Sequence, residues 1–185
     1  MTKRAATKNM EVEVKARCDD IDVVEARAMA LGARFEKDVE QSDIFLSHPS
    51  RDFGKTDESL RMRWVRDRCY LTYKGPRMKG LVKAREEIEL EVGDGEGLLA
   101  ALERLGFRKV GEVTKIRRIL RLDDADICLD DVEDLGTFVE VEVKAKDIEV
   151  AKRRAMSILK SLGLEKNIVK SSYYEMLHKG GKASK

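Results

Sequence analysis

Three stretches of this chain repeat a glutamate–apolar–glutamate pattern: residues 11–15 (EVEVK), 85–91 (REEIELE) and 140–144 (EVEVK). Because strand side chains alternate between two faces, each stretch, read as a β-strand, places its carboxylates side by side on one face. Like charges at this spacing repel, so sheet stability gives no reason for them. One such stretch alone is typical of a solvated sheet face, but the whole set predicts a bound cation.

Other stretches show the same alternation with the opposite charge. Residues 61–63 (RMR) and 115–117 (KIR) alternate basic and apolar side chains, and residues 68–74 (RCYLTYK) end in Lys74 on the polar face. Acidic strands that face basic strands across one closed sheet would enclose a site of mixed charge. Such a site suits an anion that arrives with a metal ion.

Each acidic stretch leads into a predicted amphipathic helix. An aspartate can cap its N-terminus, apolar residues recur at helical spacing, and a Leu-Gly pair ends it. The caps are Asp19-Asp20, Asp94 and Asp147, and the final glycines are Gly32, Gly106 and Gly163. This repeated unit looks like an internal duplication with a third, partial copy.

Further strands are predicted between these units. They lie at residues 43–47, 60–65, 69–74, 115–122 and 126–130, with tight turns at 67–68 and 123–125. Together with the acidic stretches this makes about eight strands, mostly joined by hairpins, which is the number at which a sheet can close and hold one ligand. We therefore predict an α+β fold, a closed eight-stranded antiparallel β-barrel (a tunnel) with the helices packed outside. The outward apolar positions under the helices would be Val12, Val14, Ile88, Leu90, Val141 and Val143.

Composition sets the broad class. A chain of 185 residues with 42% hydrophobic content supports one domain, which we place at residues 10–177 between disordered tails at 1–9 and 178–185. Lys+Arg 37 and Asp+Glu 35 nearly cancel, which argues against a general nucleic-acid binder. The cysteines, Cys18, Cys69 and Cys128, are far apart and form no CxxC motif. With no signal peptide and no apolar run of membrane-spanning length, we expect a cytoplasmic protein without membrane association.

The motifs and their order resemble the CYTH or triphosphate tunnel metalloenzyme superfamily, and in particular its class IV adenylate cyclase branch. The resemblance spans about residues 10–177. Its motifs are the ExExK signature at 11–15, QSDIF at 41–45, DFGKTDESLRMR at 52–63, LTYKGP at 71–76, REEIE at 85–89, KIR at 115–117, LDDVEDLGTFVEVE at 129–142 and SYYEML at 172–177.

The resemblance implies a triphosphate bound inside the tunnel. Because a triphosphate carries about four negative charges, burying it requires several side chains that stay positively charged. The expected triphosphate-binding residues are Lys15, Arg61, Arg63, Lys74, Arg85, Lys115 and Arg117. The expected ligands for Mg²⁺ or Mn²⁺, which prefer hard oxygen atoms, are Glu11, Glu13, Glu89, Asp130, Glu140 and Glu142.

Catalytic roles are expected of Lys15, Lys74 and Glu87. No histidine is placed for acid–base work, so the base would be a carboxylate, a lysine of lowered pKa or a hydroxide on the metal. Glu87 and Glu89 could instead neutralise or orient the basic residues.

Two reactions and one alternative fit these residues. An adenylate cyclase would convert ATP to cyclic AMP and pyrophosphate, and a triphosphatase would hydrolyse thiamine triphosphate, tripolyphosphate or a nucleoside triphosphate. A non-catalytic binder of polyphosphate or nucleotide is the alternative, although such a binder gains nothing from inward carboxylates without a metal. The resemblance also implies a homodimer.

Overall fold

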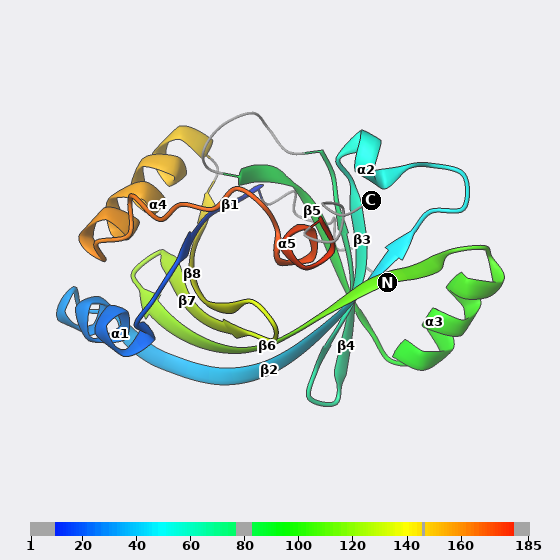
Figure 1. Cartoon of the computed structure of the whole chain (residues 1–185), viewed down its shortest axis with the longest axis horizontal. Coiled ribbons are helices and arrows are strands. Elements are labelled where there is room, and N and C mark those ends of the chain that lie inside the picture. Colours follow the sequence, from blue (N-terminus) through cyan, green and yellow to red (C-terminus); the bar gives the residue numbers. More distant parts are fainter. Residues whose placement is uncertain (1–9, 77–82, 146, 180–185) are drawn as a thin grey trace, which may run out of the picture.

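The structure is a computed structural model that describes residues 10–76, 83–145 and 147–179, without the side chains of residues 10, 11, 83, 84 and 145. This part of the chain forms eight strands and five helices (Figure 1). The strands are β1 (Met10–Arg17), β2 (Arg34–Ser47), β3 (Ser59–Val65), β4 (Arg68–Lys74), β5 (Lys83–Val92), β6 (Arg108–Leu122), β7 (Ala125–Val132) and β8 (Gly136–Ala145). The helices are α1 (Ile21–Ala30), α2 (Phe53–Thr56), α3 (Gly95–Arg104), α4 (Ile148–Ser161) and α5 (Tyr173–Lys179).

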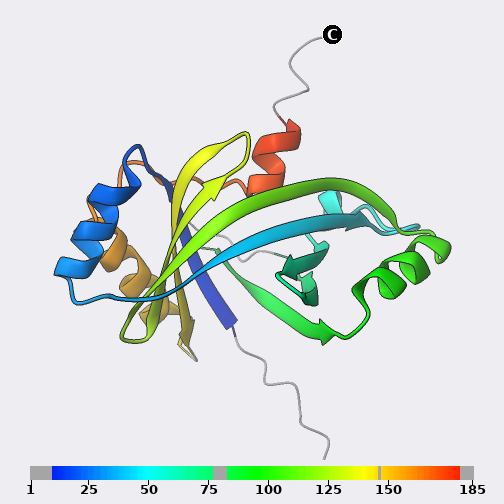
Figure 2. The same ribbon diagram turned by 90° about the horizontal axis from the view of Figure 1, so that it is seen from below.

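The strands form one antiparallel sheet that curls strongly (Figure 1), and α5, red in Figure 2, lies on one side of it. Its order is β1-β5-β4-β3-β2-β6-β7-β8. β1 pairs with β8 along residues 10–17 and with β5 along residues 10–13 only. The α+β class and the eight antiparallel strands predicted from the sequence are therefore confirmed.

The strands β2 and β6 are much longer than predicted and run side by side across the whole molecule (Figure 2). β2 contains 14 residues and β6 contains 15. The pairing shifts register between Phe35 and Lys37 and between Phe45 and Leu46, and such bulges bend a strand. The first part of β2 is exposed on both faces, so it lacks the apolar alternation by which a strand is found in a sequence.

The predicted helix boundaries are confirmed. The side chains of Asp20, Asp94 and Asp147 accept hydrogen bonds from backbone N–H groups in the first turn of α1, α3 and α4. After α1 and α3 the chain turns at Gly32 and Gly106, each with a φ of 95°, which a residue without a Cβ adopts easily.

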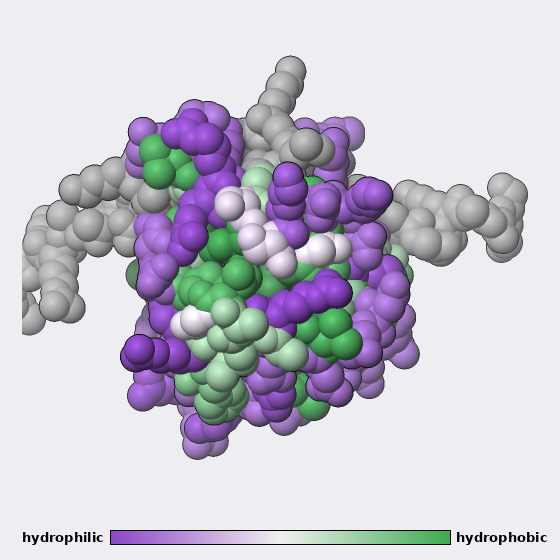
Figure 3. All heavy atoms as spheres, turned by 90° about the vertical axis from the view of Figure 1, so that its left-hand side faces the viewer, coloured by the Kyte–Doolittle hydropathy of each residue, from purple (hydrophilic) through white to green (hydrophobic). Residues whose placement is uncertain are grey.

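The main apolar core lies between β1, β7 and β8 and the helices α1 and α4. Val12, Val14, Val141 and Val143 are at most 1% exposed, as predicted. α1 and α4 lie together at the left of Figure 1. Figure 3 views the molecule from this side, where hydrophilic side chains surround a central apolar area.

The prediction that Ile88 and Leu90 lie beneath a helix is wrong. Their side chains are 44% and 56% exposed. α3 packs its leucines, including Leu98 and Leu102, in a cluster with Met62 and other residues of β3 and β4. None of the described helices therefore covers the outer face of β5 at these positions.

Two boundaries differ from those predicted. The hairpin turn between β3 and β4 is formed by Arg66 and Asp67, one residue earlier than expected, and Arg66 has a positive φ of 53°. α5 continues through His178 and Lys179, which we had placed in the C-terminal tail. His178 is held there because its ring stacks on Tyr174 with 4.4 Å between centroids. The predicted tails at 1–9 and 180–185 lie outside the described residues.

Among the residues that the structure describes, no helix combines the length and the apolar character needed to cross a membrane.

Candidate functional site

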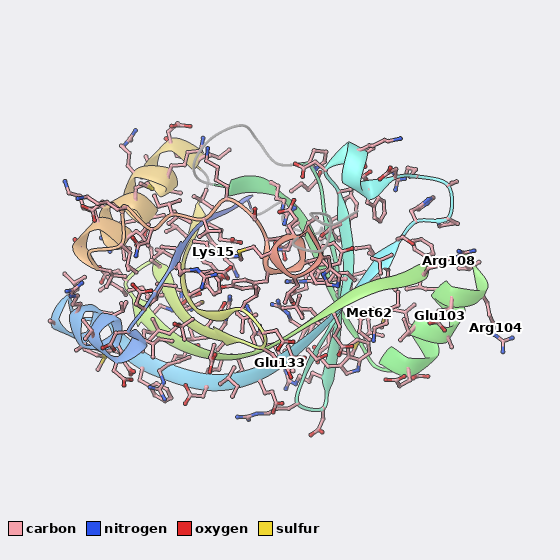
Figure 4. The ribbon with its side chains drawn as sticks, in the orientation of Figure 1. Lys15, Met62, Glu103, Arg104, Arg108 and Glu133 are labelled. Carbon is pink, nitrogen blue, oxygen red and sulfur yellow. The ribbon has the colours of Figure 1, made fainter. Side chains whose placement is uncertain are left out.

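The concave side of the curled sheet encloses a cavity of about 1470 Å³. Inward side chains of strands from all around the sheet line it, together with residues of α5. Lys15, labelled in Figure 4, lies inside this curl, whereas Glu103 and Arg104 lie far from it on α3. The predicted site residues that line the cavity are Glu13, Lys15, Arg61, Arg63, Lys74, Arg85, Glu87, Glu89, Lys115, Arg117, Glu140 and Glu142.

Two predicted residues are not among those that line the cavity. Asp130 is 0% exposed and lies behind the cavity wall. The side chain of Glu11 lies outside the described part of the chain, although its backbone is paired with Arg85 on β5 and with Lys144 on β8.

The first charged cluster joins β2 to β3. Arg63 donates two hydrogen bonds of 2.6 Å to the two oxygens of Asp43, and Arg61 donates a third of 3.2 Å. Burial alone would raise the pKa of Asp43, but the charges of Arg61 and Arg63 outweigh burial and hold this pKa well below its usual range. The two arginines are thus fixed in place by a permanently ionised carboxylate.

The second cluster is centred on Asp130 of β7. Its carboxylate accepts hydrogen bonds from Lys115 at 2.9 Å, from Arg117 at 2.6 Å to each oxygen, and from the hydroxyl of Tyr173 at 2.8 Å. Burial opposes ionisation of Asp130, yet Arg117 and Lys115 lower its pKa. Burial, together with the neighbouring charge of Arg117, lowers the pKa of Lys115.

The third cluster lies on β8, where Glu140 and Glu142 face the cavity. Lys15 lies 2.8 Å from Glu140, and Arg117 contacts Glu140 and donates a 2.8 Å hydrogen bond to Glu142. Burial would raise the pKa of Glu140, but Lys15 and Arg117 lower it well below its usual value. Arg117 therefore binds carboxylates of both β7 and β8.

Across the cavity, β4 and β5 contribute a lysine–glutamate pair. Lys74 lies 2.7 Å from Glu87, and Arg61 lies 4.0 Å from the same carboxylate. Glu89, two residues along β5, accepts a 3.2 Å hydrogen bond from Thr72. Glu87 therefore lies beside the basic residues Lys74 and Arg61, a position compatible both with orienting them and with a direct role in the reaction.

Two carboxylates stand directly opposite each other on neighbouring strands. Glu13 of β1 is paired with Glu142 of β8, and on the other side Glu142 is paired with Asp126 of β7. The side chains of Glu13 and Glu142 are 16% and 17% exposed. Like charges directly opposite each other in a sheet are destabilising, so this row of acids favours cations beside it. Arg117 at Glu142 and Arg121 at Asp126 supply part of that positive charge.

The donor chemistry of this row fits Mg²⁺ or Mn²⁺. No group of three or more His, Cys, Asp or Glu side chains among the described residues is close enough to form a complete metal site. Mg²⁺ does not require one, because it commonly binds one or two carboxylates and completes its shell with water and substrate phosphates. Glu13 and Glu142 would hold such an ion, which would neutralise phosphate charge.

α5 covers one side of the cavity and reaches the buried clusters. The Tyr173 ring lies under Lys15, with 3.5 Å from Nζ to the ring centroid, and its hydroxyl is bonded to Asp130. Burial, with the nearby charges of Glu140 and Asp130, raises the pKa of Tyr173 well above its usual value. Tyr173 therefore acts as a neutral hydrogen-bond donor.

Several important residues were missed in the sequence. Asp43, Asp126 and Gln41 line the cavity, and their positions at the inward parity of β2 and β7 could have shown this. Tyr173 could not be found in this way, because it comes from a helix that approaches the sheet only in the folded chain. Both histidines, His48 and His178, also lie at the edge of the cavity.

A comparison with known protein families shows to which family this chain belongs. Residues 9–173 match the CYTH domain family. The chain belongs to the CYTH family. CYTH proteins act on triphosphates and use divalent metal ions in general.

Related CYTH proteins resemble this chain over nearly its whole length. A Methanocaldococcus jannaschii protein, provisionally named an adenylate cyclase, is 39% identical over 171 residues, which is 90% of this chain and 98% of the relative. A solved structure from Pyrococcus horikoshii has a TM-score of 0.84 and 36% identity, covering 92% of this chain and 99% of the other. A Hippeastrum structure, described as an adenylyl cyclase candidate with a dominant triphosphatase activity, has a TM-score of 0.68 and 20% identity, covering 92% and 96%. This last similarity concerns the fold alone.

Proposed function

We propose that this chain is a metal-dependent enzyme that binds a triphosphate in the charged cavity and converts ATP to cyclic AMP and pyrophosphate. The observation that carries this proposal is the combination of fixed arginines on β3 with the opposed carboxylates Glu13 and Glu142. The arginines can bind phosphate oxygens, the two carboxylates can bind a metal ion, and both groups line the same cavity. The pairing of β1 with both β5 and β8 supports a closed tunnel around the substrate.

The triphosphate would bind to donors of the arginine side chains that do not contact Asp43. Arg61 and Arg63 are bound to Asp43 in the structure, and further donors on both guanidinium groups can bind phosphate oxygens. The metal would supply charge neutralisation to the phosphate groups. Glu140 and Asp130 are buried against cationic side chains, so we assign them to positioning Lys15, Lys115 and Arg117. Glu13 and Glu142 are more open to the cavity, so we assign metal binding first to them.

The reaction would be an in-line displacement at phosphorus. In cyclisation the ribose 3′-hydroxyl oxygen bonds to the α-phosphorus as the bond to pyrophosphate breaks. Glu87, held by Lys74 at 2.7 Å, is our candidate to accept the hydroxyl proton. Lys15, which is 4% exposed and points into the cavity, would stabilise negative charge on the transferred group.

Hydrolysis of a triphosphate is the second candidate function. The Hippeastrum protein, which has the same fold, is described as having a dominant triphosphatase activity although it is named a cyclase, so this fold accommodates both reactions. The same cavity would serve, with water as the nucleophile and the terminal phosphorus as its target.

Product analysis separates these functions. The protein is incubated with Mg²⁺ or Mn²⁺ and with ATP, thiamine triphosphate or tripolyphosphate, and the products are identified by phosphorus NMR. Cyclic AMP with pyrophosphate supports the cyclase, and a diphosphate with orthophosphate supports the triphosphatase. Tight binding of a triphosphate without any product would favour the non-catalytic binder and contradict both.

A further inference from the structure

Gln41 is a buried residue of the cavity whose side-chain amide carries an unpaired oxygen. It lies on β2, is 7% exposed and lines the cavity. Its Oε1 atom is buried and makes no hydrogen bond within the described part of the chain. Buried polar groups in native proteins are nearly always hydrogen-bonded, so an unpaired atom in a binding cavity marks a place where a ligand or water supplies the partner.

The lack of a hydrogen-bond partner distinguishes Gln41 from the other buried polar side chains that the structure describes. Each of the others holds at least one hydrogen-bond or ion-pair partner: Lys15, Asp43, Thr72, Lys74, Lys115, Arg117, Asp130 and Glu140. Exchanging the amide oxygen and nitrogen of Gln41 leaves an amide atom at the same unpaired position, so this difference does not depend on their assignment.

The surroundings of Gln41 are those of a phosphate site. On β6 it stands opposite Lys115, which is 3% exposed. Two residues further along β2, Asp43 stands opposite Arg63 on β3. Since inward side chains on one strand are two residues apart, the amide lies between two basic residues that we propose as triphosphate ligands.

We propose that Gln41 positions the oxygen nucleophile that attacks the bound triphosphate. This inference rests on the proposed function. With water as the nucleophile, the amide oxygen would accept a hydrogen bond from one of its O–H groups. With a ribose hydroxyl, whose single hydrogen passes to the base, the amide NH₂ group would donate a hydrogen bond to the hydroxyl oxygen. In either case a donor of the NH₂ group would bind an oxygen of the phosphoryl group under attack. An amide suits this task because it offers an acceptor and two donors without adding charge. Glutamine orients the attacking water in this way in GTPases.

The step is balanced for either source of the O–H group. The nucleophile oxygen, from water or from a sugar hydroxyl, forms a bond to phosphorus while the bond from phosphorus to the leaving phosphate oxygen breaks. The proton that leaves is the only hydrogen of the ribose hydroxyl, or the hydrogen of water that is not bonded to Gln41, and it passes to the base, for which Glu87 is the candidate. Gln41 itself gains and loses no proton.

The test compares the wild-type protein with Gln41→Met, which preserves the length of the side chain but removes both hydrogen-bonding groups. We expect kcat with ATP or tripolyphosphate to fall by about 100-fold. KM and the Kd for a non-hydrolysable imidotriphosphate should stay within about threefold. Product identity in the wild type, orthophosphate or cyclic AMP, shows whether the positioned O–H group belongs to water or to the ribose.

Ser42→Ala is the matched control. Ser42 is the next residue on β2, and its side chain faces away from the cavity to donate a 2.9 Å hydrogen bond to Glu112. This variant should keep the wild-type kcat. If Gln41→Met does not fold, the isosteric Gln41→Glu is expected to show the same fall in kcat, because it lacks the amide donor.

Two results would overturn the role of Gln41 alone: an unchanged kcat in a folded Gln41 variant, or a parallel rise in KM and Kd at constant kcat, which would make Gln41 a phosphate ligand. If the wild-type protein turns over no triphosphate, the proposed function fails and this inference fails with it.

Discussion

Glu13 of β1 stands directly opposite Glu142 of β8 in adjacent antiparallel strands. Opposite side chains in such a pair have their Cβ atoms about 5 Å apart, so the two carboxylates repel when both are ionised. Asp126 stands opposite Glu142 on the other side and extends the acidic row. Arg117 at Glu142 and Arg121 at Asp126 offset part of this negative charge. A divalent cation beside Glu13 and Glu142 would offset more of it, which is why we place the metal here.

Arg63→Ala should weaken triphosphate binding. Arg63 donates two hydrogen bonds of 2.6 Å to Asp43 within the cavity, and its loss removes a charged phosphate ligand. We expect the Kd for tripolyphosphate, measured by titration calorimetry, to rise by about 10- to 100-fold. Stability should also fall by about 3 kcal/mol, because Asp43 loses its main buried partner.

Arg68→Ala is the matched control for charge. Arg68 lies on the neighbouring strand with its side chain 69% exposed, so its removal changes the net charge equally but leaves the cavity intact. An equal loss of affinity in both variants would show that only the overall charge matters and would refute a specific role for Arg63.

The protein should lose stability in acid. Asp43, Asp130 and Glu140 have lowered pKa values in the folded state, because nearby cations outweigh their burial. A lowered folded-state pKa stabilises the fold above the unfolded value of about 4, and this contribution is lost as pH falls below about 4. Asp126 acts in the opposite direction, since burial raises its pKa. Urea unfolding at pH 6, 4 and 3 measures the balance.

Asp43→Asn provides the internal comparison for this pH dependence. Its free energy of unfolding should change less than that of the wild type between pH 4 and pH 3, since one of the three carboxylates no longer titrates. A wild-type stability that stays constant or rises over this interval would contradict the charge pairing described for the cavity.

Most of the fold could be predicted because its signals are local. The aspartate caps, the Leu-Gly helix ends and the alternation of charged and apolar residues each depend on neighbours in the sequence. The prediction that Ile88 and Leu90 lie beneath a helix was wrong, because the alternation shows which side chains share a face but not which helix covers that face. α3 follows β5 in sequence, yet it packs on β3 and β4.

Tyr173→Phe should lower the stability of the buried cluster around Asp130. The substitution removes a 2.8 Å hydrogen bond to a fully buried carboxylate but keeps the ring beneath Lys15. We expect the free energy of unfolding to fall by about 1–3 kcal/mol in urea titrations. Tyr174→Phe is the control, because that hydroxyl makes only a long 3.5 Å contact with the carbonyl of Val110, and its effect should be much smaller.

Gly111→Ala should loosen α5. A Cβ atom at Gly111 would overlap Nε2 of His178 and lie 2.7 Å from the ring of Tyr174, so one or both of these α5 side chains must move. Hydrogen exchange of the α5 amides should become faster. At Gly93 an added Cβ meets no atom within 4 Å, so Gly93→Ala should leave α5 exchange unchanged. Equal exchange in both variants would argue against close packing of α5 at Gly111.

The candidate site was only partly predictable. Period-two alternation identified the inward basic and acidic residues, because parity is fixed along a strand. Their partners depend on strand order and register, which bring Arg117 against Asp130, Glu140 and Glu142. This packing makes Glu140 and Asp130 more deeply buried than the opposed pair Glu13 and Glu142, and no pattern within one strand contains that information.

The most direct test of the account is metal-dependent turnover of a triphosphate by the wild-type protein and by the double variant Glu13→Gln with Glu142→Gln. The wild type should form product from ATP or tripolyphosphate with Mg²⁺ or Mn²⁺ and stop when EDTA is added. The double variant should stay folded, because an amide oxygen at position 142 can still accept the hydrogen bond from Arg117, and its turnover should fall by at least about 100-fold. Wild-type turnover that persists in EDTA, or full metal-dependent activity in the double variant, would contradict the account.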